Sequence, residues 1–142
     1  MRSVSRTVLD ASAFLAYLYE EPGADVVEQA LGVGCTMSAV NWAEVLSKSA
    51  DAGVAPERLV SELRNRQLLD NVLKITPLLA EDSLEMARLR PLTQPLGLSL
   101  ADRACLALGK RLGIPVLTAD QAWTAVSGIE IQVIRQAIST SR

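Results

Sequence analysis

Residues 7–20 read TVLDASAFLAYLYE, a short apolar run that ends in an acid and passes directly into helix-favouring residues. The run from Thr7 to Asp10 predicts a short buried strand, and Ala11 to about Glu20 predicts a helix. A second apolar run that ends in an acid, VLTAD at residues 116–120, lies near the other end of the chain. A strand that passes directly into a helix is the repeating unit of α/β proteins. These two stretches therefore set the expected fold class.

The segments between them continue the alternation of strands and helices. Further helices are predicted at residues 24–31, 39–50, 57–69, 77–90 and 100–112, and further strands at 35–38, 72–75, 116–118 and 129–134. Two prolines and a glycine predict a loop at 91–99. This alternation implies an α/β/α sandwich around a central, mainly parallel sheet of four to five strands. We find no internal repeat or linker, so we expect residues 1–142 to form a single domain.

The composition narrows the class of protein. The 142 residues are 49% apolar and 21% charged, which is ordinary for a globular protein. No segment resembles a signal peptide or a membrane span, so we expect a cytoplasmic protein. Cys35 and Cys105 lie far apart in unlike contexts, which argues against a disulfide framework or a zinc site. The net charge of −2 argues against a broad basic surface.

The chain contains no histidine. This absence removes Ser-His-Asp and Cys-His catalysis, together with most zinc and iron sites. The remaining hard metal ligands are carboxylates, which favour Mg²⁺ or Mn²⁺.

Four acids stand at positions where a metal-dependent nuclease needs them. Asp10 and Asp120 follow two predicted strands, while Glu44 and Asp102 lie in the early turns of the helices at 39–50 and 100–112. In open parallel sheets, sites form outside the carboxyl ends of the strands. Carboxylates crowded there repel one another unless a cation neutralises them. A metal held by such acids can activate water and clamp a phosphodiester without histidine.

Most of these acids also have a structural explanation. Asp10 and Asp120 are at positions where aspartate commonly caps the following helix. Asp102 is three residues after Ser99, which is the spacing of a capping box. Glu44 is harder to explain in this way, because it lies beyond the cap position of Ser38 and among apolar residues.

Several polar residues accompany the acids. Ser12 and Thr118 are placed to hydrogen-bond the neighbouring carboxylates, although Ser12 equally suits the first turn of a helix. Asn41, one turn before Glu44, suits either the orientation of a water molecule or a cap. Trp123 is expected to anchor the core. The cations of the helix at 100–112 are expected on the solvated surface: Arg103, Lys110 and Arg111.

Four short segments resemble, in order and spacing, the motifs of PIN-domain ribonucleases, specifically the VapC-type toxins of bacterial toxin–antitoxin pairs. The segments are VLDASA at 8–13, SAVNWAEV at 38–45, LSLADR at 98–103 and VLTADQAW at 116–123. The resemblance extends over nearly the whole chain. It implies a parallel α/β/α sandwich that binds one or two Mg²⁺ or Mn²⁺ ions and cleaves RNA. It also implies a homodimer that is silenced by a cognate antitoxin protein.

The resemblance assigns roles to individual residues. The acidic quartet would be Asp10, Glu44, Asp102 and Asp120, with Thr118 and Ser12 as its accompanying hydroxyls. Some members of the family carry a further acid just after the last motif. Here Gln121, Ala122 and Trp123 follow Asp120, and this departure from the family pattern argues against a fully occupied second metal site.

Three other classes of protein fit these residues less well. A receiver-type phosphoacceptor domain needs a second acid beside Asp10 and a lysine directly after a late strand, where the chain has Thr118, Ala119 and Asp120. A haloacid-dehalogenase-like phosphatase needs an aspartate where Ser12 stands. A non-catalytic binding module with the same fold has no need of an intact quartet.

Overall fold

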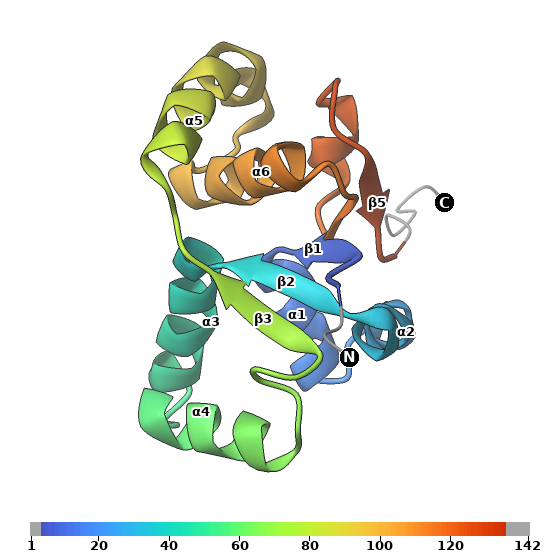
Figure 1. Ribbon diagram of the computed structural model, residues 1–142, viewed down its shortest axis with the longest axis vertical. Helices are drawn as coiled ribbons and strands as arrows, with labels where there is room; N and C mark the ends of the chain where they lie inside the picture. Colours follow the sequence, from blue (N-terminus) through green and yellow to red (C-terminus); the bar gives the residue numbers. More distant parts are fainter. Residues whose placement is uncertain (1–3, 136–142) are drawn as a thin grey trace, which may run out of the picture.

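The computed structural model describes residues 4–135 and contains one parallel sheet of five strands (Figure 1). The order across the sheet is β3-β2-β1-β4-β5, with every neighbouring pair parallel. The strands are β1 (Thr7–Leu9), β2 (Cys35–Ser38), β3 (Leu73–Thr76), β4 (Val116–Thr118) and β5 (Ile131–Val133). The predicted fold class, an α/β protein with a mainly parallel sheet of four to five strands, is confirmed.

Helices cover both faces of the sheet (Figure 1). One face carries α1 (Ala11–Leu18), α2 (Ala24–Val33), α3 (Ala39–Asp51) and α4 (Pro56–Asn65), and the other carries α5 (Ala80–Thr93) and α6 (Leu100–Leu112). The strands alternate between these faces. Leu9 and Leu117 pack with α1 to α4, whereas Val8 and Val116 pack with α6. Within residues 4–135, no helix is long and apolar enough to span a bilayer.

Three strands pass into helical structure through a capping side chain. Asp10 caps α1 directly after β1, and Ser38 caps α3 directly after β2. Asp120 follows β4 and caps a short 3₁₀ helix, η2 (Gln121–Ala125). Because the strands are parallel, these caps lie at the carboxyl edge of the sheet. The sequence pattern of an apolar run followed by a cap therefore brings several helix N-termini to the same edge.

Ion pairs and close packing fix α6 in place. Asp82, only 3% exposed, accepts hydrogen bonds from Arg111 Nε (2.8 Å) and Nη2 (3.1 Å), which join α6 to α5. Arg103 is also buried and donates from Nη1 to the Met86 carbonyl. The expectation that Arg103 and Arg111 lie on the solvated surface is therefore wrong. Both side chains reach α5, which the sequence alone did not place beside α6.

The prediction for residues 77–99 needs correction. Helix α5 begins at Ala80 rather than Pro77, because the Asp82 carboxylate accepts the backbone N–H of Leu79 and sets the helix start. The helix then continues past Pro91 to Thr93, whose side chain donates to the Leu89 carbonyl while both residues are buried. A second 3₁₀ helix, η1 (Gln94–Leu96), occupies much of the predicted loop.

Other differences concern the ends of elements. Helix α4 ends at Asn65 instead of extending to Leu69, because Gln67 and Asp70 adopt positive φ angles of 60° and 65° that a right-handed helix excludes. Strand β5 is confined to residues 131–133, at the edge of the sheet. The predicted core position of Trp123 is confirmed, with 1% of its side chain exposed.

Gly109→Ala is expected to destabilise the protein. A Cβ at Gly109 would clash with Cγ2 of Val116, because α6 passes close over β4. Overpacking of this kind costs about 1–3 kcal/mol, which offsets or exceeds the roughly 1 kcal/mol that alanine gains over glycine in a helix. Chemical denaturation should therefore show a net loss of up to about 2 kcal/mol.

Gly32→Ala is the matched control, because it is also helical and its Cβ would meet no atom within 4 Å. This variant should be as stable as the wild type or slightly more stable. An equal loss of stability in both variants would contradict the close approach of α6 to the sheet.

Candidate active site

Asp10 lies at the centre of a hydrogen-bond network at the carboxyl edge of the sheet. Its side chain is 4% exposed and accepts from the Ala13 backbone N–H at 2.8 Å. Ser12 Oγ lies 2.8 Å from both carboxylate oxygens, and Thr118 Oγ1 donates to Oδ2 at 2.6 Å. The predicted contacts of Ser12 and Thr118 with a neighbouring carboxylate are confirmed. Asp10 therefore both caps α1 and ties the end of β1 to the end of β4.

The ionisation of Asp10 is strongly perturbed. Burial raises the pKa of its carboxyl group from 3.8 to about 6, and the negative charge of Asp102 adds a smaller increase. The hydrogen bonds from Thr118, Ala13 and Ser12 lower the pKa but only partly offset the burial. A buried carboxyl group beside another acid gains stability when a cation neutralises it.

Glu44 and Asp102 approach from α3 and α6, which pack against each other. Asp102 completes the predicted capping box with Ser99: its Oδ2 accepts the Ser99 backbone N–H at 2.8 Å. Glu44 is half-buried, and its Oε1 accepts from Asn41 Nδ2 at 3.1 Å. The same Nδ2 donates to the Ala101 carbonyl at 3.0 Å, so Asn41 connects the two helices.

Cys105 lies fully buried beside three of the acids. Burial, and then the negative charges of Asp10, Asp102 and Glu44, raise the pKa of the Cys105 thiol well above its usual value. All three acids therefore lie within electrostatic range of this thiol. Cys105 was not among the residues predicted for the site, although it lies one turn after Asp102 on the same helix.

Asp120 is joined to this network through its backbone. Its N–H donates to Thr118 Oγ1 at 3.1 Å, and the preceding Ala119 N–H donates to Ser12 Oγ at 3.0 Å. Its carboxylate, however, is exposed and accepts the Ala122 N–H at 3.0 Å, as the cap of η2. Asp120 therefore lies next to the site, while its carboxylate acts as the N-cap of η2.

The capping explanation holds for Asp10, Asp102 and Asp120, yet it leaves several carboxylate oxygens available. Glu44 uses Oε1, Asp102 uses Oδ2 and Asp120 uses Oδ1, and the other oxygen of each has no hydrogen bond within residues 4–135. In that part of the chain, no three acidic or cysteine side chains stand close enough to hold a metal as they are placed. The chemistry of the donors nevertheless suits Mg²⁺ or Mn²⁺, because carboxylate oxygens are the hard ligands that these ions prefer.

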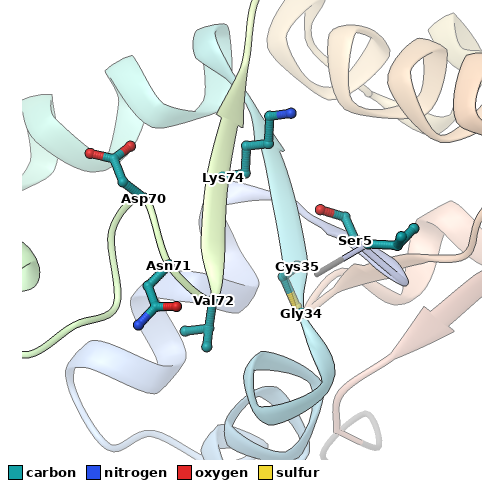
Figure 2. Close-up of a pocket in the computed structure, with 8 residues that line it drawn as sticks. Ser5, Gly34, Cys35, Asp70, Asn71, Val72 and Lys74 are labelled. Atoms are coloured by element: carbon teal, nitrogen blue, oxygen red, sulfur yellow. The ribbon is translucent and has the colours of Figure 1, made fainter. Parts of the chain in front are cut away.

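A separate cavity lies at the opposite edge of the sheet. Figure 2 shows this hollow of about 310 Å³ near the amino ends of the strands. Its lining residues are Val4, Ser5, Gly34, Cys35, Asp70, Asn71, Val72 and Lys74. None of the four acids lines this cavity, so it is distinct from the site at the carboxyl edge.

The chain belongs to the PIN-domain family, whose sequence model matches residues 7–129. A comparison with curated protein sequences found no match. The predicted resemblance to this family is confirmed, and its matched region includes the four acids and the three polar residues expected to support them.

Solved structures of toxin–antitoxin proteins share the fold. A chain of a toxin–antitoxin complex from Klebsiella pneumoniae is 14% identical, with a TM-score of 0.69 over 92% of this chain and 99% of that chain. A chain of FitAcB from Neisseria gonorrhoeae is 20% identical, with a TM-score of 0.67 over 90% and 97%. VapC20 from Mycobacterium tuberculosis, described as a sarcin-ricin loop cleaving toxin, is 13% identical, with a TM-score of 0.66 over 87% and 95%. At these identities the similarity establishes a common fold.

Asp10→Asn is expected to stabilise the metal-free protein in a pH-dependent way. Because the pKa of Asp10 is raised from 3.8 to about 6 on folding, its ionisation costs stability. That cost is absent below pH 3.8, grows as the pH rises, and is complete above pH 6. In chelator at pH 8, the variant should be about 1–3 kcal/mol more stable than the wild type, and near pH 4 the difference should be small.

Thermal or chemical unfolding at both pH values measures this difference. Asparagine keeps an oxygen that can accept the Ala13 N–H, so the cap is retained. Asp51→Asn, at an exposed acid in the last turn of α3, is the control and should shift stability by less than about 0.5 kcal/mol. A variant at Asp10 that is equally stabilised at pH 4 and pH 8 would refute the electrostatic explanation.

Proposed function

We propose that this protein is a metal-dependent endoribonuclease that acts as the toxin of a toxin–antitoxin pair. The observation that carries the proposal is a buried, hydrogen-bonded Asp10 at the carboxyl edge of a PIN fold, with Glu44 and the backbone of Asp102 joined through Asn41. Asp120 follows the neighbouring strand and completes the quartet. Family membership supports a nuclease, and the toxin–antitoxin complexes among the structures with the same fold support the role of toxin.

The acids would hold one or two Mg²⁺ or Mn²⁺ ions, and the lack of a further acid after Asp120 favours one. When bound, such an ion lowers the pKa of the attacking water and stabilises the negative charge of the leaving oxygen. Thr118 and Ser12 hold the Asp10 carboxylate in one orientation through short hydrogen bonds. The N-termini of α1, α3 and α6 place their positive ends near the acids, which favours ionised carboxylates and an incoming phosphate.

The proposed substrate is RNA, cut by water rather than by its own 2′-hydroxyl. Without histidine, the chain lacks the usual acid–base pair for internal transesterification. Attack by water in line with the 3′ oxygen leaves a 5′-phosphate and a 3′-hydroxyl. The net charge of −2 favours recognition of RNA shape and exposed single-stranded loops over bulk charge. VapC20, which shares the fold, is described as a sarcin-ricin loop cleaving toxin, and this description supports the proposed substrate.

Asp102→Asn is expected to abolish RNA cleavage while the fold stays intact. The substitution removes a charge with little change in volume, and loss of a direct ligand should reduce activity by more than about 100-fold. Chelator should have the same effect on the wild type, and added Mg²⁺ or Mn²⁺ should reverse it. End-labelling of the fragments should reveal 5′-phosphates.

Asp51→Asn again serves as the control and should cleave as fast as the wild type. Three results would each refute part of the proposal: full activity of Asp102→Asn, a 2′,3′-cyclic phosphate at the cut, or equal cleavage of single-stranded DNA. The first concerns the site, the second the mechanism and the third the substrate.

The proposed partner is a cognate antitoxin protein. A site with several acids is a negative focus, so a guanidinium from the partner would bind there and compete with the metal. We expect expression of the chain alone to arrest growth and co-expression of the neighbouring antitoxin gene to restore it. Harmless expression of soluble wild-type protein would contradict the toxin role, although the nuclease activity would still stand on the cleavage assay.

We also propose a homodimer that involves the outer face of α5. Leu84 and Leu92 are each 55% exposed and lie eight residues apart, about two helical turns, on the same side of the helix. Sedimentation should show twice the 15.2 kDa mass of one chain, and Leu84→Glu should shift the protein to monomer. Leu112→Glu, at a 41% exposed position at the end of α6, is the control and should remain dimeric. A wild-type monomer at micromolar concentration would refute this proposal.

A further inference from the structure

Asn41 is a fully buried amide between two helices that carry acids of the site. Its side chain is 0% exposed. Its Nδ2 donates to Glu44 Oε1 at 3.1 Å and to the Ala101 carbonyl at 3.0 Å. That carbonyl belongs to the peptide bond that joins Ala101 to Asp102. One amide group therefore contacts one acid directly and the backbone of another.

The orientation of this amide is set by its two acceptors. A flipped amide would direct Oδ1 at the Glu44 carboxylate and the Ala101 carbonyl, and oxygen cannot donate to either. In the observed orientation, Oδ1 is buried and has no hydrogen-bond partner within residues 4–135. An unpaired buried polar atom costs about 1–3 kcal/mol. Simple packing between α3 and α6 would favour an apolar side chain, so stability alone does not account for Asn41.

We infer that Asn41 is a positioning residue for the metal-binding acids. It holds Glu44 through Oε1 and so leaves Oε2 free to face a cation. It also fixes the Glu44 carboxylate relative to the backbone of Asp102, because the same nitrogen binds both helices. Outer contacts of this kind orient ligands and tune their affinity for a metal. This inference rests on the proposed function of the same acids, and it assigns Asn41 no direct contact with substrate.

A thermodynamic cycle on Mn²⁺ binding tests the inference. The four proteins are the wild type, Asn41→Ala, Glu44→Ala and the double variant, and the paramagnetic resonance signal of free Mn²⁺ measures affinity without RNA. Asn41→Ala should weaken binding by about tenfold or more in the wild-type background. In the Glu44→Ala background it should have almost no further effect, since Asn41 acts through Glu44.

Two further variants guard against effects on folding. Asn41→Ser, which is too short to bridge the helices, should reproduce the loss if Asn41→Ala is poorly folded. Ser49→Ala, at another buried polar residue of the same helix, whose hydroxyl donates to the Val54 carbonyl, should retain the wild-type affinity for Mn²⁺. A similar loss in Ser49→Ala would indicate a general effect of destabilising α3 and would overturn the inference.

The outcomes separate this inference from the proposed function. Equal losses from Asn41→Ala in both backgrounds, wild-type affinity in Asn41→Ala, or no Mn²⁺ binding by the wild type would each overturn the positioning role. Cleavage of RNA is measured on the same samples. A wild type that binds Mn²⁺ with the expected coupling but leaves RNA intact would refute the ribonuclease proposal while the role of Asn41 stands.

Discussion

The parallel pairing of β1 with β4 is the interaction on which the site depends. It aligns Leu9 with Leu117, and the Asp10 N–H continues the ladder by donating to the Leu117 carbonyl at 3.1 Å. One residue further on, Thr118 Oγ1 reaches Asp10 Oδ2 at 2.6 Å, although the two residues are 108 positions apart in the chain. A shift of one residue in this register would turn each strand side chain to the other face of the sheet. The network around Asp10 would then be lost, together with the alignment of the helices that begin at this edge.

Opposing electrostatic effects act on the acids at the carboxyl edge of the sheet. Burial and a neighbouring acid disfavour an ionised Asp10, whereas hydroxyl and backbone donors favour it, and burial prevails. Asp102 and Asp120 are held by caps that use one oxygen each, so capping and metal binding are compatible roles. A bound cation would relieve the electrostatic repulsion between these carboxylates, which is otherwise present in the folded protein. Stability and the proposed activity are therefore linked through the same carboxylates.

Local signals predicted most elements well, and their failures share a cause. The N-termini of α1, α3 and α6 follow from the N-caps Asp10, Ser38 and Ser99, which act within one turn and can be identified in the sequence. The bounds of the helix and the loop within residues 77–99 were predicted incorrectly, and burial of Leu89 and Thr93 keeps α5 helical past a proline. The contacts of buried Arg103 and half-buried Arg111 were missed for the same reason: their partners lie on α5, and only packing brings that helix beside α6.

The sequence by itself determined the alternation of strands and helices, the capping residues and the identity of four acids that follow strands or lie in early helical turns. These features depend on spacing along the chain. The order and spacing of the motifs also indicated the PIN-domain family. Only the tertiary structure decided how the acids lie: Asp10, Glu44 and Asp102 are within electrostatic range of Cys105, while the Asp120 carboxylate caps η2. It also decided that Asn41 spans α3 and α6. The physical reason is that strand order and helix packing depend on contacts between distant segments, which neither propensity nor local spacing encodes.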